Sequence, residues 1–189
     1  MNTLLEVREM PLLSMAQYKS IFGFPVKDYY EALGFDFDTE PWAEVAAEYM
    51  FQYHALESTF ELYDEVEQLL AYFQLKRKKQ YILSAMKTES ILTMLTRFKL
   101  KHHFDGVYGM DNHYAHGKLS VGQLLIKEAE LKPQDCLLIG DTIHDAEVAR
   151  ALGVDCCLLA SGHQDMARLK HTGREVFSSL KELMIALQG

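Results

Sequence analysis

The chain has 189 residues, of which 49% are hydrophobic, with a formal net charge of −8 at pH 7 and a pI near 5.5. This length can bury a sizeable core, and the acidic balance argues against a nucleic-acid partner, because binding to a phosphate backbone relies on clustered lysine and arginine. No apolar run is long enough to span a bilayer, so no membrane partner is expected. The one basic run, Lys76 to Lys79, fits the solvated last turn of a helix.

Cys136, Cys156 and Cys157 are odd in number and stand at the heads of apolar runs. We expect them to be buried free thiols in a reducing environment, because a disulfide framework would use paired cysteines. Residues 1–9 hold acidic side chains and no apolar segment, which does not resemble a secretory signal. The sequence therefore predicts a cytoplasmic protein.

Residues 1–65 predict an all-helical domain. Ser14 and Gln17 have the spacing of a helix capping box. A second helix is expected to begin at Pro25 and to end at Gly34, since proline suits a first turn and glycine a left-handed stop. A longer amphipathic helix is expected from residue 42 to residue 56.

Residues 66–189 predict an α/β core domain, because short apolar strands alternate with helices. Strands are expected over residues 81–84, 106–109, 136–139 and 156–159. Helices are expected over residues 65–78, 89–98, 120–130, 146–152, 165–170 and 180–187. Such alternation predicts a parallel sheet with helices on both faces, whose strands end along one shared edge.

Polar residues follow two of these strands at that edge. Asp141 and Asp145 come after Gly140 and an apolar strand, and Ser84 follows another strand. Carboxylates are the ligands that Mg²⁺ prefers, and one or two suffice to hold it. Lys118 precedes a helix after a glycine, where an ammonium could neutralise phosphate charge. Each residue also has a plainer reading: Asp145 as a helix cap, Ser84 as a turn residue and Lys118 as a solvated loop lysine.

Taken together and in this order, these residues resemble motifs of the haloacid dehalogenase superfamily, in its phosphatase-type branch with a helical cap. Its second motif matches Ile82-Leu83-Ser84, its third matches Lys118, and its fourth, Gly-Asp-x-x-x-Asp, matches residues 140–145. The resemblance extends to Phe22-Gly23-Phe24-Pro25, which is similar to the cap of phosphoglycolate-phosphatase-like members.

The resemblance implies a Rossmannoid sheet and Mg²⁺-dependent hydrolysis of a small phosphorylated metabolite. In this reading Asp141 and Asp145 bind the metal, and Ser84, Ala85 and Lys118 contact the phosphate. The family's first motif, Asp-x-Asp-Gly-Thr, supplies an attacking aspartate from a central strand, and it is not found where it belongs. Asp36-Phe37-Asp38 has the right spelling, but it follows an expected helix and is followed by Thr39 in place of glycine.

Without that aspartate we expect this chain to be inactive, although a longer form would hydrolyse phosphate monoesters. A non-catalytic phosphate-binding or interaction protein and a phosphomutase remain open as alternatives. The absent strand is the middle one of the family's sheet. Its two neighbours are therefore expected either to pair directly or to keep unpaired backbone groups, which invites self-association.

Histidines offer a weaker metal signal. His113 and His116 have helical ligand spacing, but no third ligand is visible, so zinc is not expected. His144 between the two acids is expected to start a helix. For His163 the sequence leaves two positions open, one lining the edge crevice and one in a surface loop.

Overall fold

The structure is a computed structural model that describes residues 1–110 and 117–188. Its α-helices are α1 (Asn2–Val7), α2 (Met15–Ile21), α3 (Val26–Ala32), α4 (Trp42–Leu56), α5 (Val66–Leu75), α6 (Thr88–Arg97), α7 (Lys118–Glu128), α8 (Ile143–Leu152), α9 (Met166–Lys170) and α10 (Leu180–Gln188). The strands are β1 (Tyr81–Leu83), β2 (Gly106–Tyr108), β3 (Leu137–Gly140), β4 (Asp155–Leu159) and β5 (Glu175–Phe177). Short 3-10 turns cover Glu57–Thr59, Lys101–His103 and Pro133–Asp135.

The helices α1 to α4 form a unit with a hydrophobic cluster of its own, made of Leu4, Leu5, Tyr29, Tyr30, Phe35 and Val45. The expected capping box opens α2, since the Ser14 hydroxyl accepts from the Gln17 N–H and the Gln17 side chain accepts from the Ser14 N–H. Helix α4 has the bounds that its sequence predicts. The sequence-based division at residue 65 falls just before α5.

Several boundaries differ from the expected ones for local reasons. Pro25 is the N-cap of α3 and does not lie within its first turn. Asp36 accepts the Asp38 N–H at 3.0 Å in a turn, which agrees with the rejection of this pair as a strand-end motif. Helix α7 begins at Lys118 and α8 at Ile143, each earlier than expected. Thr142 caps α8 through its side chain, and this cap sets the start of the helix.

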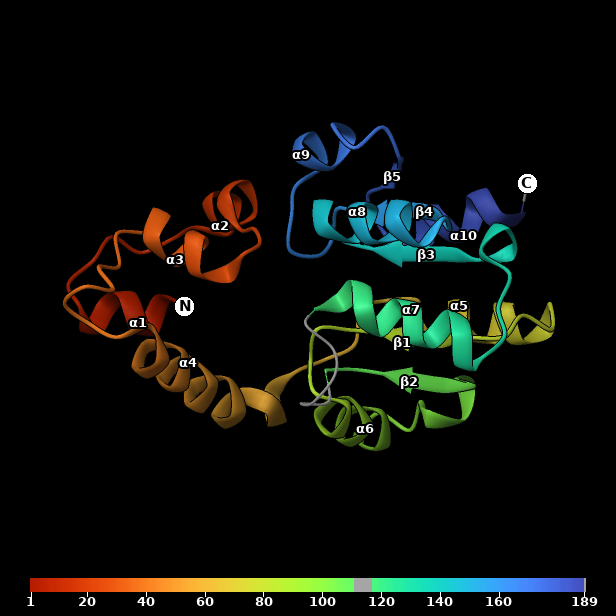
Figure 1. The fold of residues 1–189 in the computed structure, drawn as a ribbon, viewed down its shortest axis with the longest axis horizontal. Helices are drawn as coiled ribbons and strands as arrows, with labels where there is room; N and C mark the ends of the chain where they lie inside the picture. Colours follow the sequence, from red (N-terminus) through yellow and green to blue (C-terminus); the bar gives the residue numbers. More distant parts are fainter. Residues whose placement is uncertain (111–116, 189) are drawn as a thin grey trace.

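The strands form two parallel sheets and not one. Strand β1 pairs with β2, and β3, β4 and β5 form a second sheet in that order. Within the described residues β1 does not pair with β3, so the second of the two expected arrangements, with unpaired backbone groups, is the one found. Figure 1 shows β1 and β3 facing each other, with their carboxyl ends toward the helical unit.

Apolar helices cover both faces of these sheets. On one face, α7 packs closely on β1 and α8 at Gly122. A Cβ at this position would lie only 2.7 Å from a methyl of Leu152 and 3.2 Å from a methyl of Leu83. On the other face, Leu69 of α5 packs in one cluster with Cys157, Phe177 and Leu183 of the second sheet and α10. No helix among the described residues has the length and hydropathy to cross a bilayer.

Candidate active site

Asp145 is the most heavily bonded of the predicted site residues. Its Oδ1 accepts the Lys118 ammonium at 2.5 Å. Its Oδ2 accepts the backbone N–H groups of Asp141 and Thr142, each at 3.0 Å, and the Thr142 hydroxyl at 2.8 Å. The side chain is only 4% exposed. Asp145 therefore caps helix α8, as one of the two sequence-based interpretations expected. It also holds the Lys118 ammonium through a buried ion pair.

The surroundings of Asp145 favour its charged form. Burial alone raises the pKa of a carboxyl group, because it removes water from the charge. Here the Lys118 charge, the hydrogen bonds from Lys118 and Thr142 and the Asp141 N–H outweigh this effect and hold the pKa of Asp145 below its usual value. Asp145 is thus an anion at neutral pH that keeps Lys118 at the edge of the sheet.

Asp141 lies directly after β3, at the carboxyl edge. Its Oδ2 accepts the His163 N–H at 2.7 Å. Gly162 is required beside it, because a Cβ at that position would overlap the Asp141 carboxylate, and a Cβ at Gly140 would overlap the Asp145 side chain. Two loops therefore close around these carboxylates, one after β3 and one after β4.

Ser84 and Ala85 follow β1. The Ser84 N–H donates to the Tyr108 carbonyl at 3.0 Å, and its Oγ accepts the Met86 N–H at 3.1 Å. This is the turn role that the sequence left open, and it leaves the hydroxyl hydrogen free to donate outward. Among the described residues Ser84 makes no hydrogen bond to Lys118 or Asp141, but Figure 1 places the ends of β1 and β3 on the same side.

The helical unit reaches this edge through contacts that the sequence did not reveal. The Tyr18 hydroxyl lies 2.5 Å from His163 Nδ1, and the Phe22 ring stacks on the same imidazole with centroids 4.7 Å apart. The Lys19 ammonium donates to the carbonyls of Ala160 and Ser161, each at 3.0 Å. His163 therefore lines the junction between the two parts of the molecule.

The buried side chain of Gln164 also connects the helical unit to the α/β core. Its Oε1 accepts the Ile143 N–H at 2.7 Å and its amide nitrogen donates to the Phe22 carbonyl at 2.9 Å, with the residue 2% exposed. Arg168 donates to the carbonyls of Lys19 and Phe22. These partners lie far apart in the sequence, so no local pattern could have pointed to them.

The donor set suits a hard cation with few protein ligands. Within residues 1–110 and 117–188, no group of three or more His, Cys, Asp or Glu side chains is arranged to hold a metal. Mg²⁺ commonly keeps several waters and uses one or two carboxylates. Asp141 has an oxygen without a described partner, whereas both oxygens of Asp145 already accept hydrogen bonds, so Asp141 is the better placed ligand. The assignment of Asp145 to the metal stays a prediction.

The remaining histidines do not add to this set. His113 and His116 lie outside the described residues. His144 is the second residue of α8, which begins at Ile143, close to the helix start that was expected for it. Its ring lies 5.1 Å from that of Phe24, and its Nδ1 lies 3.4 Å from Glu147. Cys156 and Cys157 are buried free thiols as predicted, while Cys136 is half-buried.

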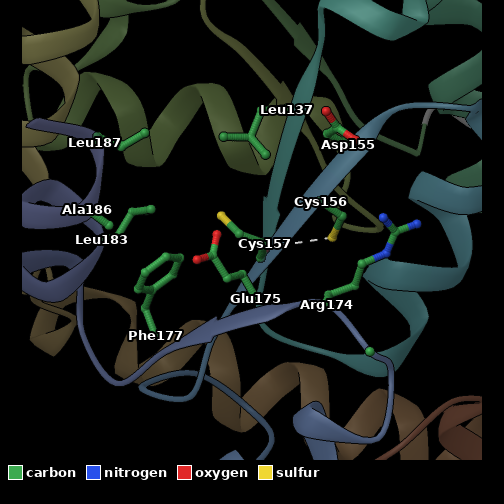
Figure 2. Close-up of a pocket in the computed structure, with 11 residues that line it drawn as sticks. Leu137, Asp155, Cys156, Cys157, Arg174, Glu175, Phe177, Leu183, Ala186 and Leu187 are labelled. Carbon is green, nitrogen blue, oxygen red and sulfur yellow. Dashed lines mark hydrogen bonds between the residues drawn. The ribbon is translucent and has the colours of Figure 1, made fainter. Parts of the chain in front are cut away.

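A cavity of about 500 Å³ lies at the opposite edge of the second sheet. Its lining includes Leu137, Asp155 and Glu175, the first residues of β3, β4 and β5, together with Arg174 and residues of α10 (Figure 2). This is the amino edge of the strands, so the cavity is separate from the carboxylates at the carboxyl edge.

The fold and this edge define a Rossmannoid α/β protein with a helical unit beside the carboxyl ends of its strands. A family model described as haloacid dehalogenase-like hydrolase matches residues 1–159. The chain belongs to this family, which confirms the resemblance seen in the sequence. No match was found among curated proteins.

Solved structures show the same fold. A haloacid dehalogenase-like hydrolase from Streptococcus pneumoniae aligns with a TM-score of 0.83 at 21% identity, over 97% of this chain and 86% of that one. A predicted phosphatase from Clostridium acetobutylicum gives 0.78 at 22% identity, over 99% and 88%. A predicted phosphoglycolate phosphatase from Haemophilus somnus 129PT gives 0.75 at 16% identity, over 98% and 88%. At such identities the likeness is one of fold alone.

Proposed function

We propose that this site serves Mg²⁺-dependent hydrolysis of a small phosphate monoester. The observation that carries the proposal is the Lys118–Asp145 ion pair beside Asp141, at the carboxyl edge of a haloacid dehalogenase-like fold. One cation, two carboxylates and a serine hydroxyl at one edge suit a phosphate held between a metal and positive charge.

Each residue has a separate role in this proposal. Asp141 would hold Mg²⁺, which supplies charge neutralisation at a phosphate oxygen. Lys118 donates to another oxygen and is held in place by Asp145, and Ser84 donates through its free hydroxyl hydrogen, with Ala85 beside it. The helical unit closes over the edge through Tyr18 and excludes water.

The attacking group is the missing part. Of the five described strands, only β3 is followed directly by a carboxylate, since Ser84, Gly109, Ala160 and Ser178 follow the others. Asp36 lies in a turn of the helical unit. We therefore expect negligible turnover by this chain, because loss of a covalent nucleophile removes several orders of magnitude of rate.

Binding and turnover should be measured together. We expect Mg²⁺ titrated calorimetrically to bind weakly, and Asp141→Asn to abolish this binding. Turnover of p-nitrophenyl phosphate should stay at the level of buffer. Clear Mg²⁺-dependent turnover that Asp36→Asn removes would show that the nucleophile had been misassigned.

The substrate class is proposed from the family resemblance and the similar structures. Phosphoglycolate is the first candidate, supported by the resemblance and by the names of similar structures. A phosphomutase would use the same residues. A non-catalytic phosphate-binding role is the second candidate, because no attacking carboxylate was identified among the described strands. Thermal stabilisation by phosphoglycolate that exceeds that by inorganic phosphate, both with Mg²⁺, would support the first. We keep a cytoplasmic location as part of this proposal, on the basis of the free thiols.

A further inference from the structure

The cavity at the amino edge of the second sheet combines an apolar floor with a charged rim (Figure 2). Its volume of about 500 Å³ is typical of sites that bind small molecules. Cys157, Phe177 and Leu183 line it and are 4%, 7% and 2% exposed, whereas Asp155 and Glu175 are exposed. The floor therefore suits an apolar body, and the rim suits a charged group.

The strand register places both carboxylates on the same face of the sheet as this floor. Asp155 comes two residues before Cys157 in β4, and Cys157 pairs with Glu175 of β5. Side chains two residues apart in a strand share a face, and so do residues paired in a parallel ladder. Cys157 packs in one cluster with Leu183 of α10. Asp155 and Glu175 therefore project to the side of the sheet that α10 covers.

Glu175 lies close to the floor of the cavity. Figure 2 shows its carboxylate beside the Cys157 thiol. Burial and the neighbouring Cys156 raise the pKa of this thiol, and the negative charge of Glu175 raises it further. Within residues 1–110 and 117–188, neither Glu175 nor Asp155 takes part in an ion pair. The rim thus carries two carboxylates that are open to a cation from outside.

Arg174 also lines the cavity, but it lies on the other side of the sheet from these carboxylates. Burial raises the pKa of Cys156, and the Arg174 charge opposes this effect, which places the guanidinium near that thiol. Cys156 packs with Ala149 and Leu169 on the opposite face. Figure 2 shows the guanidinium on the Cys156 side of β4 and the Glu175 carboxylate on the other side. The α10 side of the cavity is therefore negative.

This combination fits an organic cation better than a metal ion. In the described part of the chain, no three His, Cys, Asp or Glu side chains are arranged to hold a metal. Apolar walls would add nothing to the binding of a metal ion, whereas they stabilise an apolar body by removing it from water. Leu137, at one wall, is 45% exposed, so a ligand there would also cover apolar surface of the protein.

We propose that this cavity binds a small amphipathic amine, which is a primary ammonium group on a short apolar body. The ammonium group donates to Glu175, and Asp155, the diagonal neighbour of Glu175 on β4, adds a second negative charge. The apolar body lies against Phe177 and Leu183. Three N–H donors allow the ammonium group to bond more than one acceptor. The cavity is at the opposite edge of the sheet from Asp141, and this inference does not rest on the proposed function.

Titration of the intact chain with n-hexylammonium chloride, followed by NMR of the methyl groups, tests the proposal. Saturable shifts should appear at Leu137, Leu183 and Leu187, while Leu4 and Leu5 of the helical unit serve as internal controls. Two probes of equal length separate charge from apolar contact, since 1-hexanol is neutral and hexanoate is an anion. The ammonium should bind about threefold or more tightly than hexanol, and hexanoate should bind most weakly. Added salt should reduce the advantage of the ammonium.

Two variants separate the rim from the floor. The double variant Asp155→Asn, Glu175→Gln should lower the affinity for hexylammonium to that for hexanol and leave hexanol binding unchanged. Glu89→Gln is the matched control, because this exposed carboxylate lies on α6, outside the cavity. Ala186→Phe introduces a ring from an exposed lining position of α10 and should weaken all three probes. Circular dichroism checks that each variant is folded.

Three results would overturn the proposal. One is the absence of saturable shifts at the cavity methyl groups with hexylammonium at millimolar concentrations. Another is binding of hexanol or hexanoate as tight as that of the ammonium, because the two carboxylates would then not select a cation. The third is hexylammonium binding that Ala186→Phe leaves unchanged, since the amine would then occupy another site.

Discussion

The Lys118 ammonium and the Asp145 carboxylate are joined across a sequence separation of 27 residues, with Nζ 2.5 Å from Oδ1. The carboxylate is 4% exposed and the lysine side chain 17% exposed. The pair connects the start of α7 to the start of α8, so it fixes both helices at the edge where the candidate site lies.

Replacement of Lys118 by methionine should destabilise the fold by about 2 kcal/mol, because it leaves a buried carboxylate with only its neutral donors. Urea unfolding followed by circular dichroism measures the change. Lys127→Met is the matched control, since Lys127 lies exposed in the same helix and forms no ion pair within the described part of the chain. Equal stability of the two variants would mean that the pair adds nothing to folding.

Acid should weaken the fold through Asp145. Its pKa is depressed in the folded state, so the stability it contributes is fully present above the unfolded value, near 3.8, and is lost as pH falls through the folded value. Asp145→Asn should therefore unfold more readily than the parent at pH 7, with a smaller difference between the two near pH 3. Parallel curves of unfolding free energy against pH would contradict this.

Gly162→Ala should disturb Asp141, because the new Cβ would overlap its carboxylate. We expect a loss of about 1–3 kcal/mol in stability, as for other forced overpacking, and Mg²⁺ binding at least several-fold weaker in calorimetry. Gly23→Ala serves as control, since its Cβ would meet no atom closer than 3.8 Å. An unchanged Mg²⁺ affinity in Gly162→Ala would show that Asp141 is not a ligand of the metal.

Tyr18 and His163 should be energetically coupled. A double-mutant cycle with Tyr18→Phe and His163→Asn should give about 1 kcal/mol, the usual net value of one hydrogen bond. Tyr63→Phe is the comparison, because its hydroxyl is 3.5 Å from the Ser161 carbonyl, at the limit of bonding. A coupling energy near zero would show that this contact does not hold the helical unit to the core.

The three thiols should differ in reactivity. Burial raises the pKa of Cys156 to about 11 and that of Cys157 to about 12. A disulfide reagent at neutral pH should therefore label Cys136 first, and the other two only after denaturant is added. Mass spectrometry of the labelled peptides gives the order.

Local signals predicted most of the elements. Helix α4 matches its expected bounds because its sequence is long and amphipathic, and α2 follows from the Ser14–Gln17 box. Helix α1 was not predicted, since six residues are too few for a periodic pattern, and strand β5 was not predicted either. The Thr142-x-x-Asp145 spacing is that of a capping box and could have placed the start of α8, which was expected only at residue 146.

The site itself was only partly visible in the sequence. Residue types and their order pointed to Asp141, Asp145 and Lys118, whereas their mutual distances depend on the packing of α7 and α8. The contact between Tyr18 and His163 spans 145 residues and has no local signature. The sequence contains no segment that predicts the middle strand of the sheet, so two arrangements of its neighbours were expected. Whether β1 and β3 pair directly or keep unpaired edges depends on tertiary packing, and the structure shows the second arrangement.

The buried amide of Gln164 has a consequence for cooperativity. If the helical unit α1–α4 separated from the α/β core, the Gln164 amide would lose its hydrogen bonds to the Ile143 N–H and the Phe22 carbonyl. All of these groups would then need water as a partner. Neither part of the molecule can therefore melt without disturbing the other. Heat should be absorbed in a single calorimetric peak, although the helical unit has a hydrophobic cluster of its own.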